Sequence, residues 1–283
     1  MPQLSDRLLA SIRRVGSPTC IGLDPVLEKL PASVRAEHWE PVAAIRAFCH
    51  EVIKASAPHA AAVKFQSACF ERYGGNGIAL LHHLITEAAT LGLTVILDAK
   101  RGDIGISAEH YAAAAAASGA HAITVNAYLG LSTIEPYLKA GLGVFILVRT
   151  SNPDSDAIQS HKLADGRTLA EMMADHVAQL GDRHRGAAGL SNVGAVVGAT
   201  KAEDALALRA RMPHQIFLIP GYGAQGGTAQ DIKAMLAGRP ATDGSILVTA
   251  SRSVIYAFEP NDANWPASIA AAAQKFKDEL RAL

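Results

Sequence analysis

The chain has 283 residues, of which 49% are hydrophobic, and its 26 Lys and Arg residues balance 26 Asp and Glu residues. A chain of this length and composition can bury a large core, as one (β/α) barrel or two smaller domains would. Because the net charge is +0, no overall electrostatic attraction favours nucleic acid or an anionic membrane, and we exclude both as partners.

Short apolar runs alternate along the chain with longer segments of helix-forming residues, the pattern typical of βα units that build a parallel sheet. Each run is followed by a polar or glycine-containing turn. Eight such units without a linker favour a closed (β/α)8 TIM barrel over an open doubly wound sheet, in one domain spanning residues 1–283. The predicted strands are Thr19–Leu23, Ala61–Phe65, Leu93–Leu97, Ala122–Val125, Val144–Val148, Ala195–Gly198, Ile216–Ile219 and Ile246–Thr249.

Helices are predicted between these strands. Gly77–Leu91 and Ala229–Ala237 are rich in good helix formers and apolar at helical spacing. The tract Ala112–Ala117 lies between the third and fourth strands and, because alanine is the best helix former, predicts a crossover helix packed on the barrel. Residues 25–58 and 151–194 are longer than a minimal crossover, and we expect loop insertions there.

Two carboxylates and two cations follow the third predicted strand. Residues 98–103 read Asp-Ala-Lys-Arg-Gly-Asp directly after the apolar run 93–97. Buried charges must be paired, so an alternating carboxylate and ammonium row at the end of a strand indicates either a polarised site or a salt-bridged turn. Asp98 and Lys100 are two residues apart and, if the strand continues, point to the same side of the sheet.

Polar residues also end the other predicted strands. In a barrel the active site lies at the carboxyl ends of the strands, so each of these residues is a candidate. For a single one of them, a capping or salt-bridging role is the better interpretation. Four charges converging on one rim, from Asp24, Lys64, Asp98 and Lys100, favour a functional site instead. The remaining strand-end candidates are Asn126, Arg149, Ser151 and Thr200.

A glycine-rich segment, 220–227, follows the seventh predicted strand and contains the spacing G-x-G-x-x-G. A dinucleotide fingerprint belongs instead at the first βα turn of a Rossmann unit and needs an acidic residue closing the next strand. The loops after strands seven and eight of a barrel commonly hold phosphate. Here glycines let backbone N–H groups approach the oxygens, and Arg252 after the eighth strand supplies a charged fork.

The cysteines Cys20, Cys49 and Cys69 show no C-x-x-C or Cys/His ligand spacing. Their odd number and spacing predict reduced thiols, without disulfides or structural zinc, in a cytoplasmic protein. The first residues contain no apolar signal region, and no stretch of about 18 apolar residues occurs in the chain.

Six motifs in order along nearly the whole chain resemble the orotidine 5'-phosphate decarboxylase family, and most closely its longer bacterial branch. The resemblance implies a (β/α)8 barrel, a homodimer, no cofactor and no metal. It further implies decarboxylation of orotidine 5'-phosphate to UMP, in which Lys100 stabilises and then protonates a carbanion at C6. The motifs lie at residues 22–25, 63–66, 98–105, 150–153, 197–200 and 220–225.

The resemblance also implies roles for individual residues. Lys64, Asp98 and Lys100 match the charged catalytic row, which is completed by Asp103 reaching across the dimer interface into the partner's site. Where relatives often read Asp-Ile-Gly-Ser-Thr, this chain has Ile106 and Ser107 after Gly105, so a second ribose contact is assigned to Ser107. The implied substrate-binding residues are Asp24 for a ribose hydroxyl, Ser107, Ser151 for the pyrimidine amide edge, Pro220, Gln225 between base and phosphate, Ser251, and Arg252 for the phosphate.

Two alternatives stay open at this point. A sister class of the superfamily decarboxylates keto-sugar phosphates through a metal-stabilised enediolate and shares the D-x-K-x-x-D row. That class needs an acidic metal ligand at the end of strand one or two, where this chain offers Asp24 and Lys64. A non-catalytic nucleotide-binding barrel is the other alternative, and it predicts a broken charged row.

Overall fold

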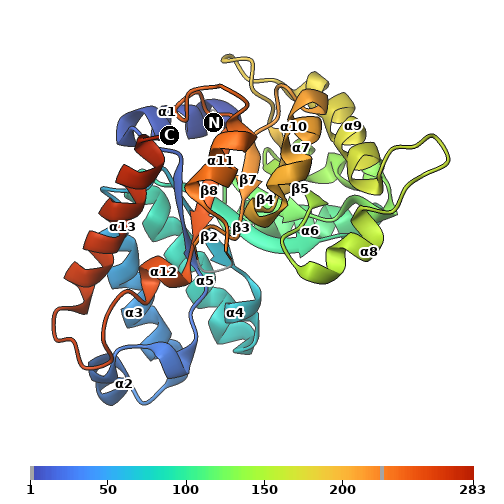
Figure 1. Cartoon of the computed structure of the whole chain (residues 1–283). Coiled ribbons are helices and arrows are strands. Elements are labelled where there is room, and N and C mark those ends of the chain that lie inside the picture. The colour runs from blue at the N-terminus through green and yellow to red at the C-terminus, as the bar shows by residue number, and fades with distance from the viewer. Residues whose placement is uncertain (1–2, 224–225) are drawn as a thin grey trace.

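The protein is a TIM barrel. A computed structural model describes residues 3–223 and 226–283. Parallel strands pair in sequence order and β8 closes on β1, so the sheet is a closed barrel (Figure 1). The strands are β1 Thr19–Leu23, β2 Ala62–Gln66, β3 Thr94–Arg101, β4 Ala122–Val125, β5 Gly143–Arg149, β6 Val193–Val197, β7 Phe217–Ile219 and β8 Ile246–Ala250.

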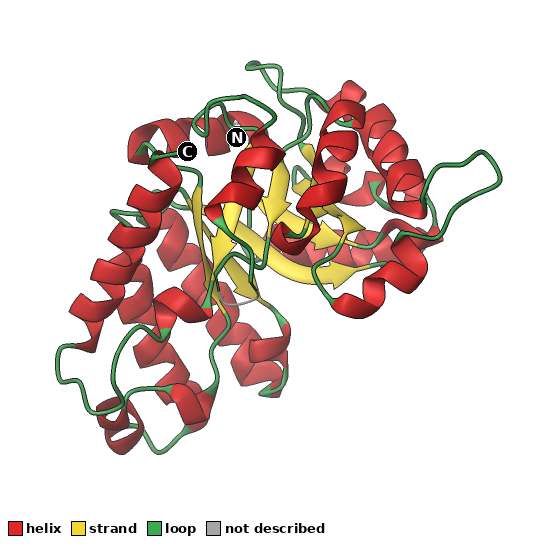
Figure 2. Ribbon diagram, in the orientation of Figure 1, coloured by secondary structure: helices red, strands yellow, loops and turns green. Residues whose placement is uncertain are grey.

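Helices surround the strands, and Figure 2 shows them in red around the yellow sheet. Residues 25–58 contain α2 and α3, and residues 151–194 contain α8 and α9. None of the helices in the described residues has the length and hydrophobicity of a membrane-spanning segment. The helices are α1 Leu4–Val15, α2 Ala32–Glu37, α3 Pro41–Ser56, α4 Ala68–Glu71, α5 Gly74–Thr90, α6 Gly105–Ala117, α7 Glu135–Lys139, α8 Asp156–Gln159, α9 Leu169–Gly181, α10 Ala202–Arg211, α11 Ala229–Leu236, α12 Arg252–Ile255 and α13 Trp265–Arg281.

The strands form where the chain is apolar without alternation, because a parallel sheet inside a ring of helices is buried on both faces. All eight predicted strands are present, with ends that differ from the prediction by a few residues. The largest difference is in β3, which continues to Arg101 and so includes Asp98, Lys100 and Arg101, which we placed after the strand. The alanine tract lies in α6, which buries Ala108, Ala112 and Ala115.

The barrel interior is filled at its amino-terminal end. One apolar cluster joins inward-facing residues of the strands, among them Cys20, Ile96 and Phe145, to Leu4 and Leu8 of α1. Helix α1 therefore closes this end of the barrel. Further along β2, β3, β4 and β8 the inward positions become polar at Lys64, Asp98, Thr124 and Thr249, and these residues line a cavity. The open end of the barrel is therefore the carboxyl end, as the fold requires for a site built on strand ends.

Candidate active site

A cavity of about 570 Å³ opens at the carboxyl ends of the strands. Residues that we predicted to bind or act on a substrate come to its wall from the ends of six strands and the loops that follow them. Those that line it are Asp24, Lys64, Asp98, Lys100, Ser151, Pro220, Ser251 and Arg252.

The charged row lies at the base of this cavity. Lys64 Nζ is 2.8 Å from Asp98 Oδ2, and Lys100 Nζ is 2.6 Å from Asp98 Oδ1. Lys64 Nζ also lies 3.7 Å from Asp24 Oδ1. The side chains of Lys64 and Asp98 are only 7% and 8% exposed, whereas that of Lys100 is 46% exposed. Lys100 is therefore the ammonium group that a bound molecule can reach.

Mutual pairing keeps these buried groups ionised. Burial alone would raise the pKa of Asp98, but the charges of Lys64 and Lys100 outweigh it and lower that pKa to about 2. Burial would lower the pKa of Lys64, but the charges of Asp24 and Asp98 outweigh it and hold the pKa above its ordinary value. Asp98 and Lys64 therefore stay charged through the neutral range and form a fixed electrostatic environment beside Lys100.

Thr124 of β4 holds the end of β3 in place. Its hydroxyl donates to Asp98 Oδ1 at 2.8 Å and accepts from the backbone N–H of Lys100 at 2.9 Å. The register between β3 and β4 shifts between Leu97 and Arg101, and Lys100 adopts a left-handed φ of 46°. Such a conformation is costly for a residue with a Cβ and persists where surrounding contacts enforce it. The result is that the Lys100 side chain turns back onto Asp98.

Within the described residues, two buried oxygens of the cavity accept or donate no hydrogen bond. They are Thr249 Oγ1 and Asp24 Oδ1, the latter with Lys64 Nζ at the longer distance of 3.7 Å. An unpaired buried acceptor is costly, so a site of this kind suits a ligand that brings hydroxyl groups. The side chain of Ser251, just after β8, lies against β1 where that strand has Gly22. A Cβ on Gly22 would lie 1.9 Å from the hydroxyl of Ser251.

The glycine-rich loop follows β7 and its first residues, Pro220, Gly221 and Tyr222, line the cavity. The Tyr222 hydroxyl donates to Glu279 Oε2 of α13 at 2.9 Å, which ties the loop to the last helix. Arg252 begins α12, which follows the neighbouring strand β8, and is exposed. Gln225 lies outside the described residues.

Several candidate residues are absent from the described lining of this cavity. Asp103 and Ser107 are partly exposed at the start of α6, and Asp103 accepts a hydrogen bond from the N–H of Ile104. Asn126 caps a short helix by accepting from the N–H of Tyr128. Arg149 and Thr200 bond within the wall behind Ser151. For Asn126, Arg149 and Thr200 the capping and pairing interpretation therefore holds.

Other polar residues of the cavity wall have no individual role assigned from the sequence. Some of them lie inside the motifs described above, and Thr124 stands at an inward position of a strand. They are Gln66, Thr124, Thr150, Asn152, Asp154, Ser155, Gln159, Tyr222 and Thr249. In residues 3–223 and 226–283, no group of three or more His, Cys, Asp or Glu side chains is arranged to hold a metal ion.

Comparison with known proteins gives consistent results over most of the chain. The model of a family described as "Orotidine 5'-phosphate decarboxylase / HUMPS family" matches residues 17–264. Relatives named orotidine 5'-phosphate decarboxylase from Rhodopirellula baltica and Deinococcus radiodurans are 38% and 42% identical to this chain. The first alignment covers 99% of this chain and 100% of the relative, and the second covers 84% of each. The solved structure of Leishmania donovani OMP decarboxylase is similar with a TM-score of 0.77 at 32% identity, over 99% of both chains.

Proposed function

The chain belongs to the orotidine 5'-phosphate decarboxylase family, and we propose that it converts orotidine 5'-phosphate to UMP and carbon dioxide, the last step of de novo pyrimidine nucleotide synthesis. The observation that carries this proposal is the intact row Lys64–Asp98–Lys100 at the base of the cavity. A barrel that had lost its chemistry would have no reason to retain so costly an arrangement of buried charge.

The reaction breaks the bond between C6 of the pyrimidine and its carboxylate, and the electron pair stays on C6. No carbonyl is placed to delocalise this charge directly, so the protein must stabilise it electrostatically. Lys100 supplies a positive charge beside C6 and then transfers a proton to it, and the neutral amine recovers a proton from solvent. Two unit charges about 4 Å apart interact by roughly 4 kcal/mol at an effective dielectric constant near 20.

Asp98 and Lys64 hold this catalytic ammonium group. Both carboxylate oxygens of Asp98 are engaged, one by Lys64 and the other by Lys100 and Thr124. These bonds support a positioning role for Asp98 in addition to any repulsion of the substrate carboxylate. Because Lys64 is fully enclosed by Asp24 and Asp98, we assign it to orienting the row rather than to proton transfer.

The remaining substrate contacts follow from the family and from the cavity wall. Asp24, whose buried Oδ1 accepts no hydrogen bond from the described residues, would accept one from a ribose hydroxyl. Ser151 would bond the amide edge of the pyrimidine, and Arg252 would bind the phosphate with a bidentate fork. Pro220 and Ser251 would pack beside them, with Gln225 between base and phosphate. Phosphate binding far from C6 can then contribute to catalysis by driving closure of the site.

We further propose that the active form is a homodimer in which Asp103, and with it Ser107, enters the partner's cavity. Both residues are accessible at the start of α6 and neither is part of the described lining of its own chain's cavity. The apolar side chains of Ile104 and Ile106 beside them are 61% and 68% exposed. Burial of such a patch between two copies would contribute to association. A cytoplasmic location stays a prediction.

Spectrophotometry tests the proposed function directly. Purified protein is mixed with orotidine 5'-phosphate in excess chelator, and the loss of substrate absorbance is followed against a Lys100→Ala control. We expect turnover by the wild-type protein to persist in chelator. Absence of turnover with and without added divalent cation would refute the function, while turnover only with added metal would point to the metal-dependent sister chemistry.

A further inference from the structure

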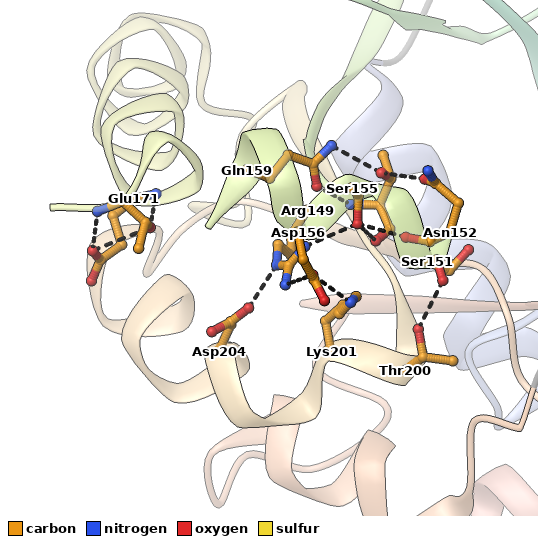
Figure 3. Close-up of polar contacts among 12 residues, drawn as sticks. Arg149, Ser151, Asn152, Ser155, Asp156, Gln159, Glu171, Thr200, Lys201 and Asp204 are labelled. Carbon is orange, nitrogen blue, oxygen red and sulfur yellow. Dashed lines mark hydrogen bonds and ion pairs between the residues drawn. The ribbon is translucent and has the colours of Figure 1, made fainter. Parts of the chain in front are cut away.

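The guanidinium group of Arg149 is buried behind the wall of the cavity, and each of its three nitrogens donates a hydrogen bond. Its Nε donates to Asp204 Oδ2 at 2.6 Å, its Nη2 to Asp156 Oδ1 at 2.5 Å and its Nη1 to the hydroxyl of Ser155 at 3.0 Å (Figure 3). The side chain is only 3% exposed. A buried guanidinium group needs partners of this kind to offset its loss of hydration, so these partners help to fix the position of the end of β5.

The two carboxylates come from different segments of the chain. Asp156 is the first residue of α8, in the connection that follows β5, whereas Asp204 lies in α10, after β6. Lys201, at the start of the same segment as Asp204, donates to Asp156 at 2.6 Å. The network therefore fastens the loop after β5, which carries Ser151, to the segment after β6.

The segment after β6 also touches Ser151 directly. The hydroxyl of Thr200 donates to the carbonyl of Ser151 at 3.2 Å (Figure 3). The backbone of Gly198 approaches so closely that a Cβ there would lie 2.8 Å from both Cα and N of Ser151. The absence of a side chain at Gly198 thus allows a close contact on one side of Ser151, and the hydrogen bond from Thr200 stabilises that contact.

The residue before Ser151 is held from the other side. Gln159, the last residue of α8, accepts from the N–H of Thr150 at 2.8 Å and donates to its hydroxyl at 2.9 Å. The hydroxyl of Ser155 lies 3.1 Å from the carbonyl of Thr150. The backbone around Ser151 is therefore fixed on both sides, while its side chain lines the cavity.

We propose that Arg149, Asp156 and Asp204 are positioning residues that aim Ser151 at the pyrimidine base. This inference rests on the proposed function, because it deepens the role assigned there to Ser151. The network contacts neither Asp24 nor Arg252, which bind ribose and phosphate. It should therefore control recognition of the base and leave binding of the sugar phosphate unchanged.

Calorimetric titration with two ligands tests the inference, with UMP as the complete nucleotide and ribose 5-phosphate as the fragment that lacks the base. The variant Asp204→Ala removes one arm of the network. Its matched control is Asp175→Ala, because Asp175 of α9 also pairs with an arginine of α10, Arg211 at 2.9 Å. Its hydrogen-bond partners among the described residues, Arg167 and Arg211, are not part of the Arg149 network.

We expect Asp204→Ala to raise the dissociation constant of UMP by about tenfold or more, since small displacements of a positioning group have effects of this order. Ribose 5-phosphate should bind as in the wild type, and Asp175→Ala should alter neither ligand. If Asp204→Ala does not fold, Thr200→Val carries the same expectation, because it removes the bond to Ser151 and preserves the side-chain volume.

A double-mutant cycle with Ser151→Ala provides the second readout. If Asp204 acts through Ser151, adding Asp204→Ala to Ser151→Ala should weaken UMP binding little further. Equal weakening of both ligands by Asp204→Ala, or fully additive effects, would show that the network only supports the fold. Those outcomes overturn the inference in a protein that still decarboxylates orotidine 5'-phosphate, whereas loss of that activity in the wild type would overturn the proposed function.

Discussion

At the scale of single residues, the site separates one accessible cation from a set of buried charges. Lys100 is almost half exposed, while Lys64 and Asp98 are enclosed and paired. A side chain that must reach a reacting atom has to be accessible from the cavity, whereas the side chains that orient it are held more firmly when they are buried. Two substitutions test these roles separately, one at Lys100, which is assigned to the reaction, and one at Arg252, which is assigned to phosphate binding.

Lys100→Ala should abolish decarboxylation while leaving UMP binding largely intact. The ammonium group acts on a charge and a proton that arise only after the ground state, and Asp98 keeps Lys64 and Thr124 as partners in the variant. Loss of one preorganised stabilising group typically lowers kcat by about 10² or more. Steady-state kinetics and UMP titration measure the two effects, with Lys54→Ala on the outer helix α3 as control. A variant that kept more than about a tenth of the wild-type kcat would refute the assignment.

Arg252→Ala should weaken binding of UMP strongly and leave binding of uridine nearly unchanged. Arg252 is exposed at the rim of the cavity. Its guanidinium group can form bidentate hydrogen bonds with a phosphate, and uridine has no phosphate to accept them. Titration of both ligands into the wild type and the variant measures the difference. Equal losses for UMP and uridine would indicate that Arg252 supports the fold instead.

At the scale of elements, neighbouring strands set one another's geometry at both ends of the barrel. Thr124 of β4 shapes the end of β3 beside the cavity. At the opposite end, His121 just before β4 accepts a hydrogen bond from the N–H of Val95 at 2.9 Å through Nδ1. That bond requires a neutral imidazole. Burial, and then the charge of Arg7, lower the pKa of His121 from its ordinary value of 6.5 to about 4.

This pairing predicts a pH-dependent stability. Because the folded pKa of His121 lies below the unfolded one, the unfolded chain binds the proton more readily. The contribution of His121 is therefore fully present above pH 6.5 and is lost as the pH falls towards about 4. Urea unfolding across this range measures it. His121→Gln should remove that part of the slope, and the same change at the exposed His83 of α5 should retain it. Identical slopes for wild type and His121→Gln would contradict the prediction.

At the scale of the whole molecule, the proposed dimer determines whether a site is complete. If Asp103 enters the neighbouring cavity, the two sites of a homodimer are related by a two-fold axis and neither exists in a monomer. A Lys100→Ala chain and an Asp103→Ala chain are then each inactive alone. In a heterodimer of the two, one cavity receives both lesions and the other receives none.

Mixing the two inactive variants under conditions that exchange subunits should therefore restore activity. Random assortment makes about half of the dimers heterodimers with one intact site, so roughly a quarter of all sites recover. Activity of the mixture, compared with each variant and with wild type at equal concentration, measures this recovery. Demonstrated subunit exchange without recovered activity would place Asp103 in its own chain's cavity.

The sequence by itself was enough to predict the barrel, because its strands are continuous apolar runs and its helices repeat apolar residues at helical spacing. Both are local patterns. It also predicted which charged residues meet, since a barrel brings the carboxyl ends of all its strands to one rim. Asp24, Lys64, Asp98 and Lys100 follow from that rule alone, and they line the cavity together.

The tertiary structure decided the direction of individual side chains. Arg149 continues the inward positions of Phe145 and Leu147 by simple alternation, but the register of β5 against β6 shifts between Leu147 and Arg149. A shift of this kind re-aims a side chain, and Arg149 pairs behind the wall instead of lining the cavity. Thr124 became recognisable only from its strand neighbours. Such directions depend on contacts between segments far apart in the chain, which no local pattern encodes.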